Sequence, residues 1–271
     1  MAVVKNGIFG YYNGQIITPQ SLGIDYTGIE KCKQFFNSGS ISDEVQQYAV
    51  YRLVGDLQTY GIWDKTYTIY PIVGGTAEAH KFNLKDPRDL DEAHRITFEG
   101  TWTHTNQGMI ANTGTSNYGN THFSQSLISS TDGEIGYYSR TNTGTNTGVD
   151  FGDYTSPGSY SLLIKYNGGF YGRAATQDIN FVSNPGTRGL FSIQSYDTNK
   201  QRFIYRGVFT EEATATTTGT SNSNVLIGTG RYGSVKTQCA FAYTSQALNE
   251  SEAANLYTAV QRFQTTLGRQ V

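Results

Sequence analysis

The feature that most constrains this sequence is a long succession of short segments, from about residue 63 to residue 243, in which apolar and polar residues alternate. In the run 160–166, for example, Tyr160, Leu162 and Ile164 fall on every second position. A period of two places such side chains on one face of a β-strand. Turns rich in glycine, asparagine and threonine separate the segments, and no helical pattern stands between them, which argues against βαβ units. The sequence therefore predicts a mainly β protein, an antiparallel sandwich or barrel.

Composition agrees with one large β domain and excludes several partners. Only 15% of the 271 residues are charged, whereas glycine occupies 31 positions and tyrosine 20. The 20 basic and 22 acidic residues give a formal net charge of −2, which provides no electrostatic footprint for nucleic acid. No run approaches the ~18 apolar residues of a membrane-spanning helix. The first residues contain no apolar run of signal-peptide length, so we expect synthesis in the cytoplasm of the producing cell.

Turn residues predict where several of the strands begin and end. Asn13 and Gly14 separate the β-rich runs 8–12 and 15–18, which predicts a hairpin. A turn at 132–133 precedes a strand over 134–140. A further strand is predicted over 202–209. The uncharged runs 141–147 and 213–224 predict long surface loops or edges that meet a neighbouring subunit.

Two helices are predicted, one on each side of the strand-rich region. The first begins after Ser42 as N-cap and ends before Gly61, and a polar stretch precedes it as far as residue 40. Its apolar stripe consists of Val45, Ala49, Val50, Leu53, Val54 and Leu57. The second begins at Asn249 with Glu252 in a capping box and ends at Gly268. We therefore predict a segment over 1–62, hairpin plus helix, for attachment or oligomerisation, and a sandwich over 63–271.

A glycine motif over 228–233 matches the dinucleotide fingerprint G-x-G-x-x-G. The phosphate-binding mechanism requires a helix to begin within the glycines. The residues that follow, 234–243, are β-branched and aromatic. The motif is interpreted as a turn between two strands, and no nucleotide cofactor is predicted.

An acidic run over 86–92 contains Asp86, Asp89, Asp91 and Glu92. Alternate carboxylates on one strand can flank a sugar as acid and nucleophile in glycosidases, and Asp89 and Asp91 have that spacing. Glu92 breaks the third position, while Pro87 and the neighbouring basic residues favour a solvated charged turn. A calcium site in this loop is a third interpretation.

The remaining reactive residues form no recognisable constellation. The four histidines, His80, His94, His104 and His122, lack the spacing of a zinc site. Cys32 and Cys239 are far apart in sequence, which predicts two reduced, buried thiols. No G-x-S-x-G elbow occurs. The sequence predicts no catalytic residue, no metal ligand, no cofactor and no enzymatic activity.

Aromatic side chains are the remaining signal for ligand binding. Tyrosine and tryptophan stack on sugar rings but also fill sandwich cores. For Tyr118, Tyr138 and Trp102 we favour packing in the core or between subunits over ligand contact.

Four segments resemble virion proteins of tailed bacteriophages: YPIVGGTAEAHKFNLK (70–85), IANTGTSNYGNT (110–121), YSRTN (138–142) and AANLYTAVQRFQTTLGR (253–269). Those proteins look like concanavalin A-like, laminin-G-type jelly rolls, and the similarity covers about residues 45–271. The resemblance implies a virion structural protein, such as a capsid decoration, head fibre or tail component, whose jelly roll binds host or environmental glycans. It also implies a virion location and other virion proteins as partners.

Two alternatives remain beside this interpretation: a free carbohydrate-binding module and a glycoside hydrolase that uses the acidic run. The three-carboxylate strand of the enzymatic relatives is absent here, which counts against hydrolysis. Low charge, uncharged loops and a terminal amphipathic helix suit a homo-oligomer, with a trimer as one form.

Overall fold

The structure is a computed structural model of the chain. It describes residues 10–12, 15–112, 117–141, 148–154, 158–166, 168–176, 179–181, 186–229 and 237–271. The helices are α1 (Tyr26–Ser38), α2 (Glu44–Thr59), α3 (Ala77–His80) and α4 (Glu250–Thr266). Short 3₁₀ turns lie at Gln20–Leu22, Trp63–Lys65, Asp91–Ala93 and Gln125–Leu127. None of the described helices is long and apolar enough to cross a membrane.

Two antiparallel sheets form the body of the molecule, and a separate hairpin precedes them. The seven-stranded sheet has the order β12 (Ile179–Phe181), β11 (Gly169–Ala174), β10 (Tyr160–Tyr166), β9 (Val149–Gly152), β16 (Asn224–Thr229), β7 (Tyr118–Ser124), β4 (Thr97–Glu99). The eight-stranded sheet has the order β15 (Val208–Thr214), β14 (Lys200–Tyr205), β13 (Gly189–Asp197), β8 (Gly133–Ser139), β17 (Cys239–Ser245), β6 (Gly108–Ala111), β5 (Trp102–Thr105), and β3 (Thr66–Tyr70) also pairs with β17. The hairpin consists of β1 (Gly10–Tyr12) and β2 (Gln15–Ile17).

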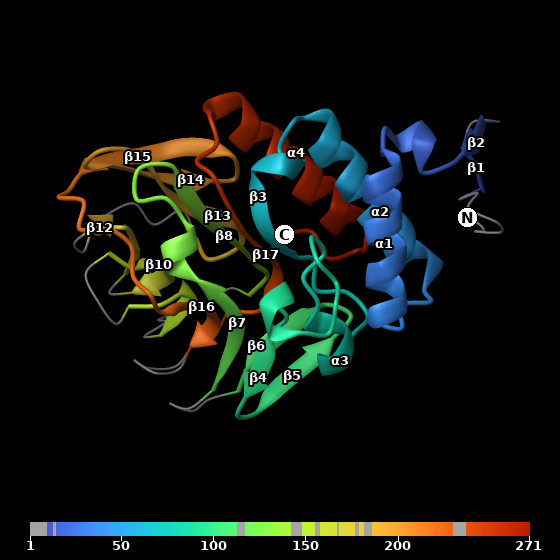
Figure 1. Cartoon of the computed structure of the whole chain (residues 1–271), viewed down its shortest axis with the longest axis horizontal. Coiled ribbons are helices and arrows are strands. Elements are labelled where there is room, and N and C mark those ends of the chain that lie inside the picture. Colours follow the sequence, from blue (N-terminus) through green and yellow to red (C-terminus); the bar gives the residue numbers. More distant parts are fainter. Residues whose placement is uncertain are drawn as a thin grey trace.

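The eight-stranded sheet is the middle of three layers. One of its faces packs on the seven-stranded sheet, and the other packs on α2 and α4, with α1 outside α2 (Figure 1). Strand β8 shows the consequence, because all seven of its residues are buried. Tyr137 belongs to the core between the sheets, whereas the next residue, Tyr138, belongs to the core beneath the helices. Because successive side chains of a strand point to opposite faces of the sheet, one strand contributes side chains to both cores.

The predicted antiparallel β-sandwich is confirmed. β10 coincides with the predicted run 160–166, and its alternate residues Tyr160, Leu162 and Ile164 are fully buried. β8 lies where the strand after the 132–133 turn was expected. α4 begins at Asn249 with a complete capping box to Glu252.

Three local expectations are wrong. Residues 26–38 form α1, where a polar stretch was expected, because Asp25 caps a segment that buries one face. α2 is capped by Asp43 instead of Ser42, and Val45 is 52% exposed, outside the buried stripe. The expected strand over 202–209 is two strands, since residues 206–207 take positive φ values of 53° and 74° in a hairpin turn. The predicted turn residues 13 and 14 lie outside the described residues.

Polar contacts join the helices to one another and to the start of the sandwich. Asp56 of α2 accepts two hydrogen bonds of 2.7 Å from Arg262 of α4. Lys65, next to β3, donates to Glu252 of α4 at 2.6 and 2.8 Å. The hairpin β1–β2 lies at the opposite end of the molecule from β12 and β15 (Figure 1). The boundary at residue 62 stays a prediction.

Candidate functional site

The outer face of the seven-stranded sheet carries the candidate site. In the pairing of β10 with β11, Ser161 lies opposite Arg173, and Leu162 lies opposite Gly172. Leu162 points into the core between the sheets. Because neighbouring strand residues point to opposite faces, Arg173 lies on the outer face, and Tyr171 shares it two residues earlier.

Tyr154 and Arg173 form the centre of this site. Tyr154 follows β9 and is 36% exposed, while Arg173 is only 7% exposed. The guanidinium carbon lies 4.3 Å from the centroid of the Tyr154 ring, a cation–π contact worth roughly 0.5–2 kcal/mol. Arg173 Nη1 also donates to Ser159 Oγ at 3.2 Å. The buried arginine therefore holds an aromatic ring that solvent can reach.

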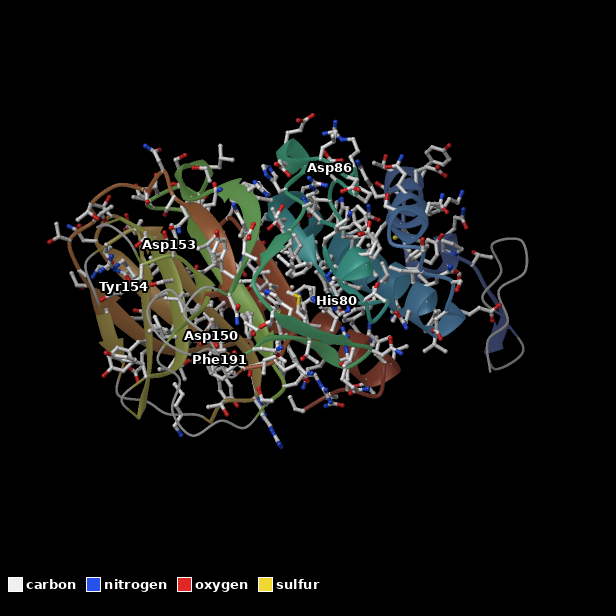
Figure 2. All side chains as sticks on the ribbon, turned by 90° about the horizontal axis from the view of Figure 1, so that it is seen from below. His80, Asp86, Asp150, Asp153, Tyr154 and Phe191 are labelled. Atoms are coloured by element: carbon white, nitrogen blue, oxygen red, sulfur yellow. The ribbon has the colours of Figure 1, made fainter. Side chains whose placement is uncertain are left out.

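Two buried carboxylates hold the backbone of β9 and of the residues that follow it. Asp153 Oδ1 accepts a hydrogen bond of 2.8 Å from the Tyr154 amide. Asp150 Oδ2 accepts one of 2.7 Å from the Ile164 amide, and its Oδ1 accepts the Thr237 hydroxyl. Asp153 and Tyr154 lie close together at the sandwich end of the molecule (Figure 2). Asp150 thus links β9 to β10, and Asp153 fixes the backbone of Tyr154 itself.

Tyr154 differs from the other rings of the sandwich. Among the aromatic residues whose side chains the structure describes, Tyr26 of α1 and Tyr154 are the two that reach 36% exposure. Tyr171 is half-buried and contacts Tyr166 edge-on at 5.1 Å between centroids. An open aromatic ring beside hydroxyl and guanidinium groups can bind the apolar face of a sugar while the polar groups meet its hydroxyls.

The acidic run lies in a charged surface loop, as the solvated-turn interpretation predicted. Asp86 pairs with Arg88 at 2.6 Å, and Asp89 pairs with Lys81 and Arg95 at 2.9 and 2.6 Å. Hydrogen bonds from Arg95 and Lys81 lower the pKa of Asp89.

Asp91 begins a 3₁₀ turn, so Asp89 and Asp91 do not share a strand, which removes the geometry required of the glycosidase interpretation. Asp86 is remote from Tyr154 (Figure 2). The described residues contain no group of three or more His, Cys, Asp or Glu side chains that could hold a metal ion.

The fold brings together two histidines that are 24 residues apart. His80 Nδ1 and His104 Nδ1 are 3.0 Å apart, so one ring donates a hydrogen bond to the other. Burial, with the neighbouring His104 and Arg269, lowers the pKa of His80 to about 3. His94 and His122 contact each other through a backbone oxygen at 3.2 Å. Spacing in the sequence contained no signal for either contact.

The aromatic residues named from the sequence are buried or half-buried. Tyr138 is fully buried, and Tyr118 and Trp102 are half-buried. Trp102 packs against Phe98 and His104 at the edge of the sandwich, with centroids 5.1 and 6.1 Å away. Neither Tyr154 nor Arg173 was predicted as a site residue, because their contact depends on strand register.

Other sequence features have structural roles. Cys32 and Cys239 are free and buried, as predicted. Gly228 lies in β16, and the next described strand is β17, so strands flank the glycine motif. Its residues 230–233, like the loop residues 142–147, lie outside the described residues.

The architecture defines the chain as an antiparallel two-sheet β-sandwich. No protein-family model matches the sequence, and no curated protein matches it. Among solved structures, a receptor binding domain is similar with a TM-score of 0.51 and 12% identity over 76% of this chain and 53% of that chain. The binding domain of botulinum neurotoxin DC, solved in complex with rat synaptotagmin II, has a TM-score of 0.50 and 12% identity over 73% and 52%.

A further similar structure is domain 4 of AbnA, a GH43 extracellular arabinanase from Geobacillus stearothermophilus, in complex with arabinotriose. Its TM-score is 0.47 and its identity 13%, over 71% of this chain and 98% of that chain. The chain spans about half the length of the two binding domains above. At these identities the likeness is one of fold.

Proposed function

We propose that this chain is a saccharide-binding β-sandwich whose contact surface is the outer face around Tyr154 and Arg173. The observation that carries the proposal is the exposed Tyr154 ring, held 4.3 Å from a buried guanidinium group. Such a ring is already ordered before a ligand arrives, which lowers the entropic cost of binding. The fold also supports the proposal, since it is shared with domains that are described as binding domains.

The proposal is for binding without hydrolysis. Asp89 and Asp91 are engaged by Lys81 and Arg95 on the surface, and Asp150 and Asp153 bond to backbone amides. With these contacts, no two of the four carboxylates are placed as the acid and the nucleophile of a glycosidase, which lie on opposite sides of a sugar.

The experiment is calorimetric titration of the full chain with a panel of neutral and charged oligosaccharides. Tyr154→Ala should weaken binding by about tenfold or more, because a central aromatic contact contributes roughly 1–2 kcal/mol. Tyr26→Ala removes the other exposed aromatic ring, on α1, and should leave binding unchanged. Equal losses in both variants, or no binding across the panel, would contradict the proposal.

We also propose that the chain is an oligomeric component of a phage particle, anchored through its N-terminal hairpin. The resemblance of four sequence segments to virion proteins supports this, and so does the position of β1–β2. In the part of the chain that the structure describes, these two strands pair only with each other. A two-stranded hairpin is marginally stable alone in water, so contacts with other copies or with virion proteins would stabilise it.

Light scattering of the full chain and of residues 19–271 tests this anchor. The deletion removes the hairpin but keeps α1, whose N-cap is Asp25. The full chain should form a defined oligomer, such as a trimer, and the shortened chain should be monomeric. A full chain that stays monomeric, or an oligomer that survives the deletion, would remove the hairpin as the anchor.

A further inference from the structure

Three arginines lie along one edge of the eight-stranded sheet. Arg140 directly follows β8, Arg188 directly precedes β13, and Arg206 directly follows β14. These strands are neighbours in the order β14-β13-β8, and the register pairs Gly189 with Ser139. With about 4.8 Å between strands and Arg206 opposite Leu190, the three backbone positions lie within roughly 12 Å. We call Arg140, Arg188 and Arg206 the arginine edge.

Two members of the arginine edge are open to solvent. Arg188 and Arg206 are exposed. Arg206 Nη2 lies 3.5 Å from the Arg188 backbone oxygen, and its guanidinium lies 5.1 Å from the Tyr205 ring centroid. The Tyr205 hydroxyl donates to the same oxygen at 2.9 Å. These contacts hold the Arg206 side chain against the backbone of Arg188 without neutralising its charge.

Arg140 is held by neutral acceptors. Its Nε donates to the Arg269 backbone oxygen at 2.7 Å, and its Nη1 donates to Gln238 Oε1 at 3.0 Å and to the Gln107 oxygen at 3.2 Å. Arg269 itself is fully buried and bonds to the backbone oxygens of Pro71, Ile72 and Ala240. A fourth positive charge therefore lies behind the edge.

No side-chain carboxylate among the described residues forms an ion pair with the arginine edge. No carboxylate there lies within ion-pair distance of Arg140, Arg188 or Arg206, although exposed arginines elsewhere, such as Arg88, are paired. Asp150, bonded to Thr237 beside Gln238, is fully buried and committed to its own partners. In a chain with a formal net charge of −2, this is a local concentration of positive charge.

We propose that the arginine edge binds an acidic saccharide, carboxylated or sulfated. Guanidinium groups recognise carboxylate and sulfate oxygens through paired hydrogen bonds. Neighbouring strands are about 4.8 Å apart, and Arg206 lies opposite Leu190, two residues along from Arg188. The two exposed arginines are therefore separated by roughly one to two sugar units in a chain that carries a charge on each unit.

This surface goes beyond the site around Tyr154, because it lies at the other end of the sandwich. Tyr160, which begins β10 near Tyr154, bonds to the Ser129 oxygen at 2.6 Å in the segment that leads into β8. The arginine edge lies where β8 ends. The two surfaces can therefore be tested separately.

The test is titration of the full chain with an oligogalacturonate, a heparin oligosaccharide, neutral dextran and single-stranded oligo-dT. We expect binding of the carboxylated or the sulfated saccharide, and the two arms show which acid is preferred. The variant Arg188→Ser/Arg206→Ser should bind it about tenfold more weakly or worse, since it loses the charged hydrogen bonds of both guanidinium groups. Both side chains are exposed, so the variant should keep its unfolding temperature.

The matched control is Lys33→Ser/Arg88→Ser, which removes the same charge from exposed positions elsewhere. It should bind like the unchanged chain. Failure of the full chain to bind either acidic saccharide would overturn the proposal. An equal loss in the control, or equally tight binding of oligo-dT, would overturn it too, since each would show a general polyanion effect.

Discussion

At the scale of single residues, the interior contains ionisable groups whose burial links stability to pH. Glu134 of β8 is 1% exposed and accepts hydrogen bonds from the Tyr243 hydroxyl and, at 3.3 Å, from the Leu248 amide. Burial raises the pKa of Glu134 from 4.5 to about 7, although the hydrogen bond from Tyr243 opposes the shift. The folded protein therefore binds this proton more tightly than the unfolded chain does.

Glu134→Gln should stabilise the protein at high pH. A raised folded-state pKa means that the contribution of Glu134 is fully present below about pH 4.5 and is lost as the pH rises through about 7. The neutral amide can accept from Leu248 and donate to Tyr243, so we expect little change at pH 4 and a gain of roughly 2–3 kcal/mol at pH 8. Urea unfolding between pH 4 and pH 8 measures this. Glu99→Gln, on the exposed end of β4, is the control, and a gain independent of pH would contradict the prediction.

The sequence alone could identify some of these residues but not their contacts. The strand over 134–140 was predictable from its alternation, so a buried position for Glu134 was within reach. The contact between Tyr154 and Arg173 was not, because residues 19 apart in sequence meet only through the register of β10 and β11. The arginine edge has the same origin, since three loops contribute one residue each.

At the scale of elements, caps and periodicity decided which helices the sequence revealed. α4 was predicted to the residue at its start, because Asn249 and Glu252 form a capping box that strong local signals specify. α1 was missed although Asp25 accepts from the Gly28 amide at 2.7 Å and Ile29, Cys32 and Phe36 follow a helical period. The many polar residues of α1 face solvent, and in the sequence they made its apolar stripe difficult to recognise.

The cap of α4 should contribute measurably to global stability. Asn249→Ala removes the acceptor of the Glu252 amide, at 3.0 Å, and should lower the free energy of unfolding by about 1 kcal/mol. Asn249→Ser retains a capping oxygen and should lie within a few tenths of a kcal/mol of the unchanged protein. Chemical denaturation compares the three chains. Equal stability of the alanine and serine variants would show that the cap contributes nothing.

At the scale of the whole molecule, the shared middle sheet couples the helices to the sandwich. Strands β8, β13 and β17 supply residues to both cores, so neither core can lose its order without exposing the other. The sequence predicted the sandwich and the terminal helices separately. That they form three layers depends on long-range packing that no local pattern encodes.

The two tryptophans can report on this coupling, because Trp63 belongs to the helical core and Trp102 packs against the core between the sheets. We expect Trp63→Phe and Trp102→Phe, each with one remaining tryptophan, to show transitions at which tryptophan fluorescence and far-UV circular dichroism coincide. A fluorescence transition that precedes the loss of β-structure in either variant would show that the layers unfold independently.

The helical layer also makes the two sides of the sandwich different from each other. Because α2 and α4 cover the outer side of the eight-stranded sheet (Figure 1), the helices and Tyr154 lie on opposite sides of the sandwich. Copies held through the helical side and its hairpin would all present Tyr154 in the same direction. Contacts that are weak in one copy would then add across the array, so avidity could reach 10²–10⁴ times the affinity of one copy, an order-of-magnitude range for linked sites. A modest sugar site on an oriented, repeated subunit is enough for firm attachment to a glycan-coated surface.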